Sequence, residues 1–161
     1  VTAALTVGDI ARRQFEAIPI RLPEAQMQRD VEAKAGLVNL ASDRFGDTVE
    51  LGNIYWATAA GFRIAEMQAS FWRELVSAPI PPHLGKQAAG LYVAEVHRTT
   101  LSLLEKALRY HSKNVQLATL YKSETPWSQS SADEALRLTE YLGRLRPCRG
   151  NAQPGNQGEE D

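Results

Sequence analysis

The chain has 161 residues, of which 43% are hydrophobic and 23% are charged, as in a folded globular domain and unlike a disordered chain. Its 18 basic and 19 acidic residues give a formal net charge of -1, and their interspersed placement argues against a nucleic-acid partner. Charges interrupt every apolar stretch well before the roughly 18 residues that a membrane-spanning helix requires, so we expect no membrane span.

Two helices are predicted in the N-terminal third of the chain. Apolar residues recur every three or four positions over 7–18 and again over 24–51, which is the period of one face of an α-helix. Pro19 and Pro23 separate the two segments because proline cannot donate the helical hydrogen bond, and Pro23 suits the first turn of the second helix. Gly52 and Asn53 then provide a stop signal.

A third helix is predicted over 54–76, and the same period assigns its faces. The face predicted to point outward carries Arg63, Glu66, Ser70 and Arg73. The face predicted to point inward carries apolar residues: Trp56, Ala59, Ala60, Ile64, Met67, Phe71 and Leu75. Because the turn before this helix is so short, the second and third helices should lie antiparallel.

The second half of the chain is predicted to hold two more helices and a tail. Three prolines within 79–82 indicate a stiff, extended connector over 77–82. A long helix is predicted over 84–118, and residues 112–114 are a position where it could be interrupted. The capping-box spacing of Ser131 and Glu134 predicts the start of a fifth helix. We therefore expect one all-α domain over 1–146, a flexible polar tail over 147–161, and no sheet. Within the domain, Phe45, Ile64 and Leu104 should be buried between hairpins.

Residue types that bind metals are present, but their spacing argues against a metal site. His97 and His111 lie about 21 Å apart along one predicted helix, and His83 has no ligand partner at zinc spacing. We expect all three histidines at the surface. Cys148 is the only cysteine, which excludes an internal disulfide and a pair of thiolate ligands.

No catalytic or cofactor motif is recognised in the chain. Carboxylates on the predicted helices have Arg or Lys three or four positions away, which is typical of a solvated helix face. Gly36, Gly61 and Gly90 lie singly inside predicted helices, so we interpret them as places of close helix–helix approach and not as a nucleotide-binding loop. We predict no catalytic residues, no metal and no cofactor.

About half of the chain, residues 31–82 and 92–110, resembles tetratricopeptide-repeat-like (TPR-like) proteins of myxobacteria and their relatives, some of which belong to envelope-spanning gliding-motility systems. Ile64 and Ala65 resemble the Leu-Gly pair of a first repeat helix, and Ala41 with Phe45 resembles the small-aromatic spacing of a second. The other matching motifs are Lys34-Ala35, Tyr55-Trp56-Ala57, Ala59-Ala60, Ala78-Pro79-Ile80-Pro81-Pro82 and Glu105-Lys106-Ala107-Leu108.

The resemblance implies an α-solenoid fragment of antiparallel hairpins that acts as a scaffold in the periplasm or cell envelope. The predicted hairpins are longer than the 34-residue repeat of that family, so the repeats would be elongated. The chain begins at Val1 and not Met, and we expect a processed protein or part of a longer one.

We expect a non-catalytic protein–protein interaction scaffold whose partners are peptides or other protein subunits, in a homo- or hetero-oligomer. The candidate partner contacts are Trp56, Phe62, Arg63, Gln68 and Arg73. For Trp56 we favour a place in the core over a binding role, because large aromatics chiefly fill interiors. Two alternatives stay open. One is a small helical-bundle enzyme or ligand carrier with a pocket between the third and fourth helices, and the other is a structural subunit that packs an uncovered helix face on another chain.

Overall fold

The structure, a computed structural model, describes residues 2–50 and 52–145 and folds them into five α-helices, with no strand among these residues. The helices are α1 (Thr2–Ala17), α2 (Glu24–Glu50), α3 (Ile54–Val76), α4 (Lys86–Leu120) and α5 (Pro126–Leu145). The prediction of an all-α chain is confirmed. The predicted tail over 147–161, with Cys148, lies outside the described residues.

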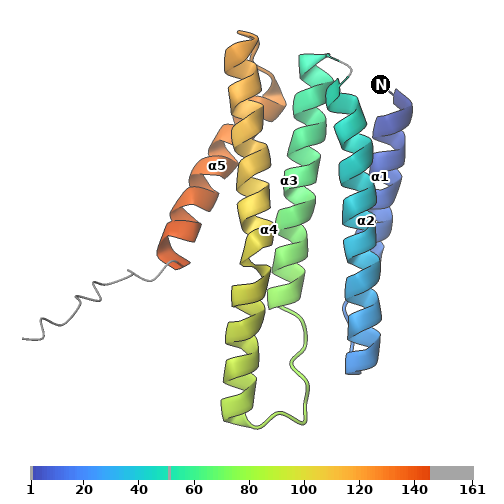
Figure 1. Ribbon diagram of the computed structural model, residues 1–161, viewed down its shortest axis with the longest axis vertical. Coiled ribbons are helices and arrows are strands. Elements are labelled where there is room, and N and C mark those ends of the chain that lie inside the picture. Colours follow the sequence, from blue (N-terminus) through green and yellow to red (C-terminus); the bar gives the residue numbers. More distant parts are fainter. Residues whose placement is uncertain (1, 51, 146–161) are drawn as a thin grey trace, which may run out of the picture.

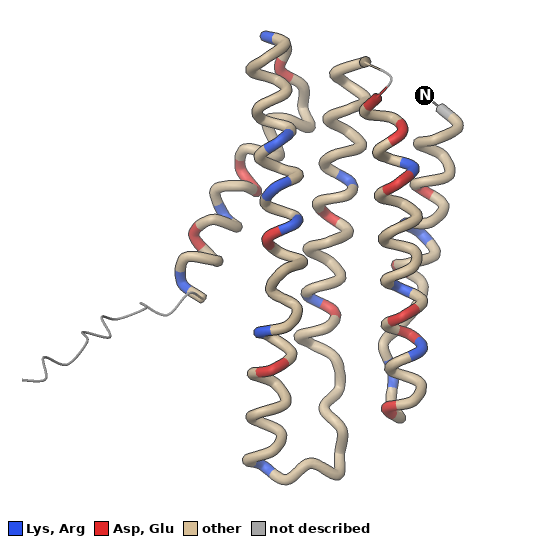
Figure 2. Tube along the Cα trace, viewed as in Figure 1, with Lys and Arg blue, Asp and Glu red and all other residues tan. Residues whose placement is uncertain are grey.

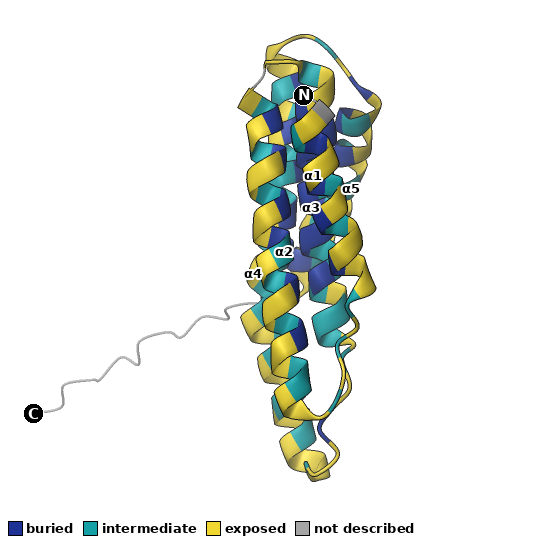
Figure 3. Ribbon diagram, turned by 90° about the vertical axis from the view of Figure 1, so that its right-hand side faces the viewer, coloured by how far each residue is buried: buried dark blue, intermediate teal, exposed yellow. Residues whose placement is uncertain are grey.

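The helices form a series of antiparallel hairpins in which each helix packs on the next one along the chain (Figure 1). α3 occupies the centre, with α2 on one flank and α4 on the other. Seen from the side, α2 and α4 lie toward one edge of the molecule and α5 toward the other (Figure 3). α3 also contacts α5 directly, and Arg63 of α3 bonds to Asp9 of α1. Both α1 and α5 therefore border α3.

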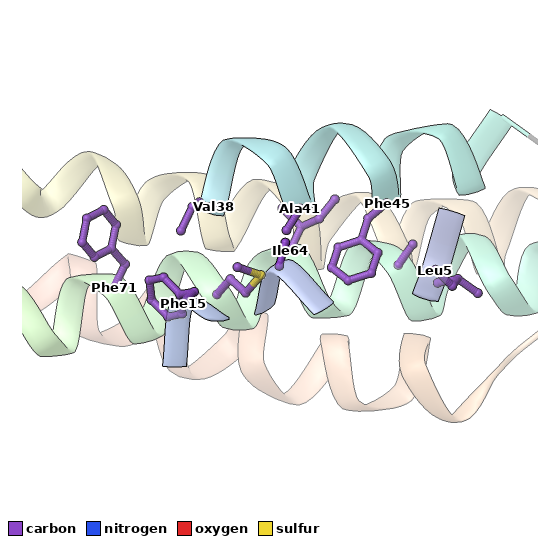
Figure 4. Packing of buried hydrophobic residues seen from close by; sticks show 10 residues of the cluster. Leu5, Phe15, Val38, Ala41, Phe45, Ile64 and Phe71 are labelled. Carbon is purple, nitrogen blue, oxygen red and sulfur yellow. The ribbon is translucent and has the colours of Figure 1, made fainter. Parts of the chain in front are cut away.

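The main hydrophobic core lies between α1, α2 and α3 (Figure 4). Phe15 of α1 meets Phe71 of α3 edge to face, with ring centroids 5.7 Å apart. Phe45 of α2 and Ile64 of α3 are fully buried in the same cluster, and Leu104 of α4 is also buried. The predicted burial of Phe45, Ile64 and Leu104 is thus confirmed. Charged residues of both signs lie on all five helices (Figure 2).

α5 begins at Pro126, so the prediction of a helix start at Ser131 was wrong. The backbone N–H of Ser128 donates to Thr125 Oγ1 at 3.1 Å, and the backbone N–H of Thr125 donates to Ser128 Oγ at 2.9 Å. This reciprocal pair is a capping box, and Pro126 fills the first helical position, where no N–H is needed. α4 runs unbroken to Leu120, so the chain does not break at 112–114.

The three helical glycines of the sequence analysis divide into two kinds. A methyl group at Gly61 would overlap the side-chain amide of Asn114 on α4, so α3 and α4 approach closely there. Nothing lies within 4 Å of a methyl group placed at Gly36 or Gly90. The interpretation as close helix–helix contacts is right for Gly61 and wrong for Gly36 and Gly90, which are exposed.

Lys34 is the unexpected member of the interior, since its side chain is 0% exposed. Its ammonium donates to the backbone carbonyls of Phe15 and Ile18 at the end of α1, the latter at 2.7 Å, and lies 2.7 Å from Glu74 Oε2 of α3. It also lies 4.0 Å from the centre of the Phe15 ring. Lys34 of α2 therefore joins α1, α2 and α3, and its positive charge complements the carbonyl end of α1.

Candidate functional site

A groove runs along α3 between α1 and α5 and has a volume of about 460 Å³. Its volume falls within the range of about 300–1,000 Å³ that is usual for ligand sites. α3 forms the floor, one side of α1 forms one wall, and Trp127 of α5 contributes to the other. The lining residues are Arg12, Phe15, Glu16, Phe62, Arg63, Glu66, Met67, Ser70, Arg73 and Trp127.

Two of the three groove arginines are held by carboxylates of α1. Arg63 Nη1 donates to Asp9 Oδ2 at 2.8 Å across the α1–α3 contact. Arg12 bonds to Glu16 at 2.6 Å and lies 3.5 Å from the other oxygen of Asp9. This network fixes the orientation of two guanidinium groups and balances their charge. For Arg73, no ion pair within 4.0 Å is found in the described part of the chain.

One end of the groove is aromatic. The ring of Phe62 lies 5.5 Å from that of Trp127, and the guanidinium of Arg63 lies 5.9 Å from the centre of the Trp127 ring, within reach of a cation–π contact. Trp127 is in the groove because α5 begins at Pro126 and its first turn packs on the middle of α3. The groove therefore has an aromatic end near Phe62, and Arg73 lies eleven residues further along α3.

A buried polar cluster lies between α3, α4 and α5. Asn114 Nδ2 donates to the backbone carbonyl of Thr58 at 2.8 Å and to Ser131 Oγ at 2.9 Å. His111 Nδ1 lies 3.2 Å from the same hydroxyl, and Thr58 Oγ1 lies 2.8 Å from Thr125 Oγ1. The prediction that all three histidines lie at the surface was wrong for His111, which is 1% exposed.

His111 lies between Ser131 on one side and Glu66 on the other. His111 Nε2 lies 3.9 Å from Glu66 Oε1, while its other ring nitrogen faces Ser131. Ser131 is 0% exposed, and its hydroxyl is already engaged by Asn114 and His111. A substrate therefore does not reach this hydroxyl in the observed packing, and the arrangement serves to fasten α5 to α4 and α3.

Burial also shifts the protonation of this cluster. Desolvation lowers the pKa of His111 to about 4, so the imidazole is neutral at pH 7. Desolvation, with a smaller contribution from the nearby charge of Glu134, raises the pKa of Glu66, whereas Arg73 acts in the opposite direction. The pKa of Glu66 thus lies above the ordinary value of a glutamate, and its carboxyl is more readily protonated than that of a free glutamate.

A second, smaller cavity of about 240 Å³ lies between the end of α3 and the start of α4. It is covered by the proline-rich connector and lined mainly by apolar side chains, with Ser77 and Tyr92 as its polar ones. This is the location expected for the pocket of an enzyme or ligand carrier. The cavity is smaller than the usual ligand site, and no set of polar groups converges in it.

The structure brings three of the five predicted contact residues together. Phe62, Arg63 and Arg73 all line the groove. Trp56 lies apart at the start of α3, where it is 39% exposed and packs edge to face on Tyr55, so the preference for a core position was wrong. Gln68 is buried on α3 and does not line the groove, because the α3 positions that do so are 62, 63, 66, 67, 70 and 73.

Sequence reasoning did not identify the groove walls. Arg12 and Glu16 fall within the helix predicted over 7–18, and Trp127 lies before the predicted start of the fifth helix at Ser131. The signal for Trp127 was the pair Thr125-Pro126, a cap followed by a first-position proline, with Ser128 at the capping distance. No local signal shows that α1 and α5 both border α3, because that proximity depends on how the hairpins stack.

Two features are not found in the described helices. No cluster of three or more His, Cys, Asp or Glu residues suited to a metal ion occurs within residues 2–50 and 52–145. Over the same residues, no helix has a stretch long and apolar enough to cross a bilayer. Comparisons with family models, with curated proteins and with solved structures return no match to this chain.

Proposed function

We propose that this chain is a non-catalytic protein-interaction module, TPR-like in its stacked hairpins, that binds a segment of another protein in the groove between α1 and α5. The observation that carries the proposal is the groove itself. Two aromatic rings, two arginines with fixed orientation and one arginine that has no ion pair among the described residues all face it. Aromatic and arginine side chains are the types that dominate binding energy at protein interfaces.

The stacking supports the TPR-like part of the proposal. Successive antiparallel helices pack on their neighbours along the chain, as in helical-repeat proteins, where each unit contacts chiefly the next. The hairpin of α2 and α3 spans residues 24–76, longer than one 34-residue repeat, so the units would be elongated. The resemblance to envelope-associated proteins makes the periplasm or cell envelope the place where we would look for the partner.

Blocking the groove tests the proposal. Ser70 lies on the groove floor, and the indole of Ser70→Trp would fill the groove. Ser102 is exposed on α4, so Ser102→Trp adds the same side chain away from the groove and serves as the matched control. Tagged versions of the three proteins would be used to purify partners from the source cells, with quantitative mass spectrometry as the readout.

We expect at least one protein to be enriched by the wild type and by Ser102→Trp but not by Ser70→Trp. Circular dichroism should show the same helix content and melting temperature for all three proteins. If every enriched protein is retained by a folded Ser70→Trp variant, the groove is not the binding surface and the proposal fails.

A further inference from the structure

We infer that the groove takes an extended peptide segment in which an apolar side chain is followed about four residues later by Asp or Glu. This inference rests on the proposed function and specifies its partner. Four features of the groove support it: its length, its volume, its aromatic end and its charge.

The length and volume of the groove favour an extended chain. From Phe62 to Arg73 the floor spans eleven residues of helix, or about 16 Å at ~1.5 Å per residue. A helix of that length and ~10 Å diameter would occupy about 1,250 Å³, well over twice the 460 Å³ of the groove. An extended chain covers the same distance with about five residues at ~3.3 Å each instead of eleven, so it occupies less than half the volume of the helix over that length.

The aromatic end selects an apolar side chain. Phe62 and Trp127 lie 5.5 Å apart between ring centroids, and both side chains are half-buried at the groove. These side chains provide apolar surface that an aliphatic or aromatic residue of the partner would cover, which is the most general source of binding energy.

The other end selects a carboxylate. Arg12 and Arg63 are already paired with Asp9 and Glu16, so they add little net charge. Arg73 is exposed and lines the groove, and the guanidinium fork matches the two oxygens of a carboxylate. A polyanion such as a nucleic acid is disfavoured as the ligand because Glu16 and Glu66 also line the groove. A single acidic side chain at the Arg73 end satisfies the charge pattern.

The test begins with a library of displayed eight-residue peptides selected on the full chain. We expect the enriched peptides to share an apolar residue and an acidic residue about four positions apart. An enriched peptide and its counterpart with the acid changed to Lys would then be labelled, and their affinities for wild type and variants measured by fluorescence anisotropy. Ser70→Trp should abolish binding of the acidic peptide.

A charge exchange at Arg73 provides the decisive comparison. Arg73→Glu should lower the affinity for the acidic peptide by about ten-fold or more, as expected for loss of a charge-assisted hydrogen bond. The same substitution should raise the affinity for the Lys peptide. The control Arg109→Glu makes the same change at an exposed position of α4 that does not line the groove, and it should leave both affinities within about two-fold.

Each outcome separates this inference from the proposed function. Peptides that Ser70→Trp blocks but that lack an acid, or that bind Arg73→Glu unchanged, overturn the inference and leave the groove as a binding site. The inference is also overturned if the selection enriches basic peptides or enriches no peptide. The proposed function is tested separately, by the partner purification with Ser70→Trp and Ser102→Trp.

Discussion

Lys34 shows how much one side chain can contribute when it is buried with its partners. Its ammonium binds two carbonyls that end α1 and one carboxylate of α3, so its removal leaves buried acceptors without a donor. Lys34→Met keeps most of the volume and should lower the free energy of unfolding by about 2–4 kcal/mol. Urea denaturation monitored by circular dichroism is the measurement.

Lys106 on α4 is the control for Lys34, because it is exposed. Lys106→Met should change the unfolding free energy by less than about 0.5 kcal/mol. Equal effects of the two substitutions would show that the Lys34 contacts contribute nothing beyond an ordinary surface charge.

His111 makes stability depend on pH in a direction set by its burial. Its pKa is lowered to about 4 in the folded chain from about 6.5 when unfolded, so the unfolded state binds more protons between these values. The free energy of unfolding should therefore fall by about 2 kcal/mol from pH 7 to pH 5 on account of His111. Urea denaturation at the two pH values measures this fall.

His111→Gln provides the comparison for the pH experiment. Glu66, whose pKa is raised by burial, acts with the opposite sign in wild type and variant alike, and the Asp30 carboxyl, whose pKa is lowered chiefly by a hydrogen bond from Arg21, matters only at lower pH. The variant should lose less stability than wild type between pH 7 and pH 5. The same loss in both proteins would rule out His111 as the source.

At the scale of helices, Gly61 and Gly36 test whether close packing or helix propensity decides the effect of a glycine. Gly61→Ala would push α3 against the buried amide of Asn114, and we expect a loss of about 1–3 kcal/mol despite the better helix former. Gly36→Ala adds a methyl group in open space and should stabilise the protein by about 0.5–1 kcal/mol.

Chemical denaturation of the two alanine variants beside wild type measures these changes. The two substitutions should therefore change the free energy of unfolding in opposite directions. A stabilising Gly61→Ala would mean that α3 and α4 separate without cost at Asn114, and the close approach would then have no energetic role.

At the scale of the whole molecule, the interior changes character from one side of α3 to the other. The α1–α2–α3 side holds the continuous hydrophobic cluster, whereas α5 is fastened largely by Ser128, Ser131 and the hydrogen bonds of Asn114 and His111. Helices with few buried apolar contacts open more readily than core helices. α5 should therefore open before α1–α3 unfolds.

Amide hydrogen exchange tests this order of opening. We expect amides in the middle of α5, around Leu136, to exchange at least about ten-fold faster than those around Ile64 in the middle of α3. Because Trp127 of α5 lines the groove, such opening would also remove one groove wall. Equal protection of the two helices would indicate a single cooperative unit.

The sequence by itself determined the all-α class, the position of α3 and the burial of Phe45 and Ile64, because apolar spacing, prolines and the Gly52 stop act within one helix or one turn. Gly52 indeed adopts the left-handed conformation, with a φ of 72°, that a residue without a side chain permits. Such signals are local, so they can be read without knowing which helices meet.

Only the tertiary structure decided which residues form a site. Lys34 and His111 look like surface residues in the sequence and became interior ones because neighbouring helices supply their partners. Trp56 looks like a core residue, but at the start of α3 it is exposed. The groove unites α1, α3 and α5, segments that are far apart in the chain. Their proximity follows from the stacking angles of the hairpins, which depend on side-chain packing between helices and not on the period within any one of them.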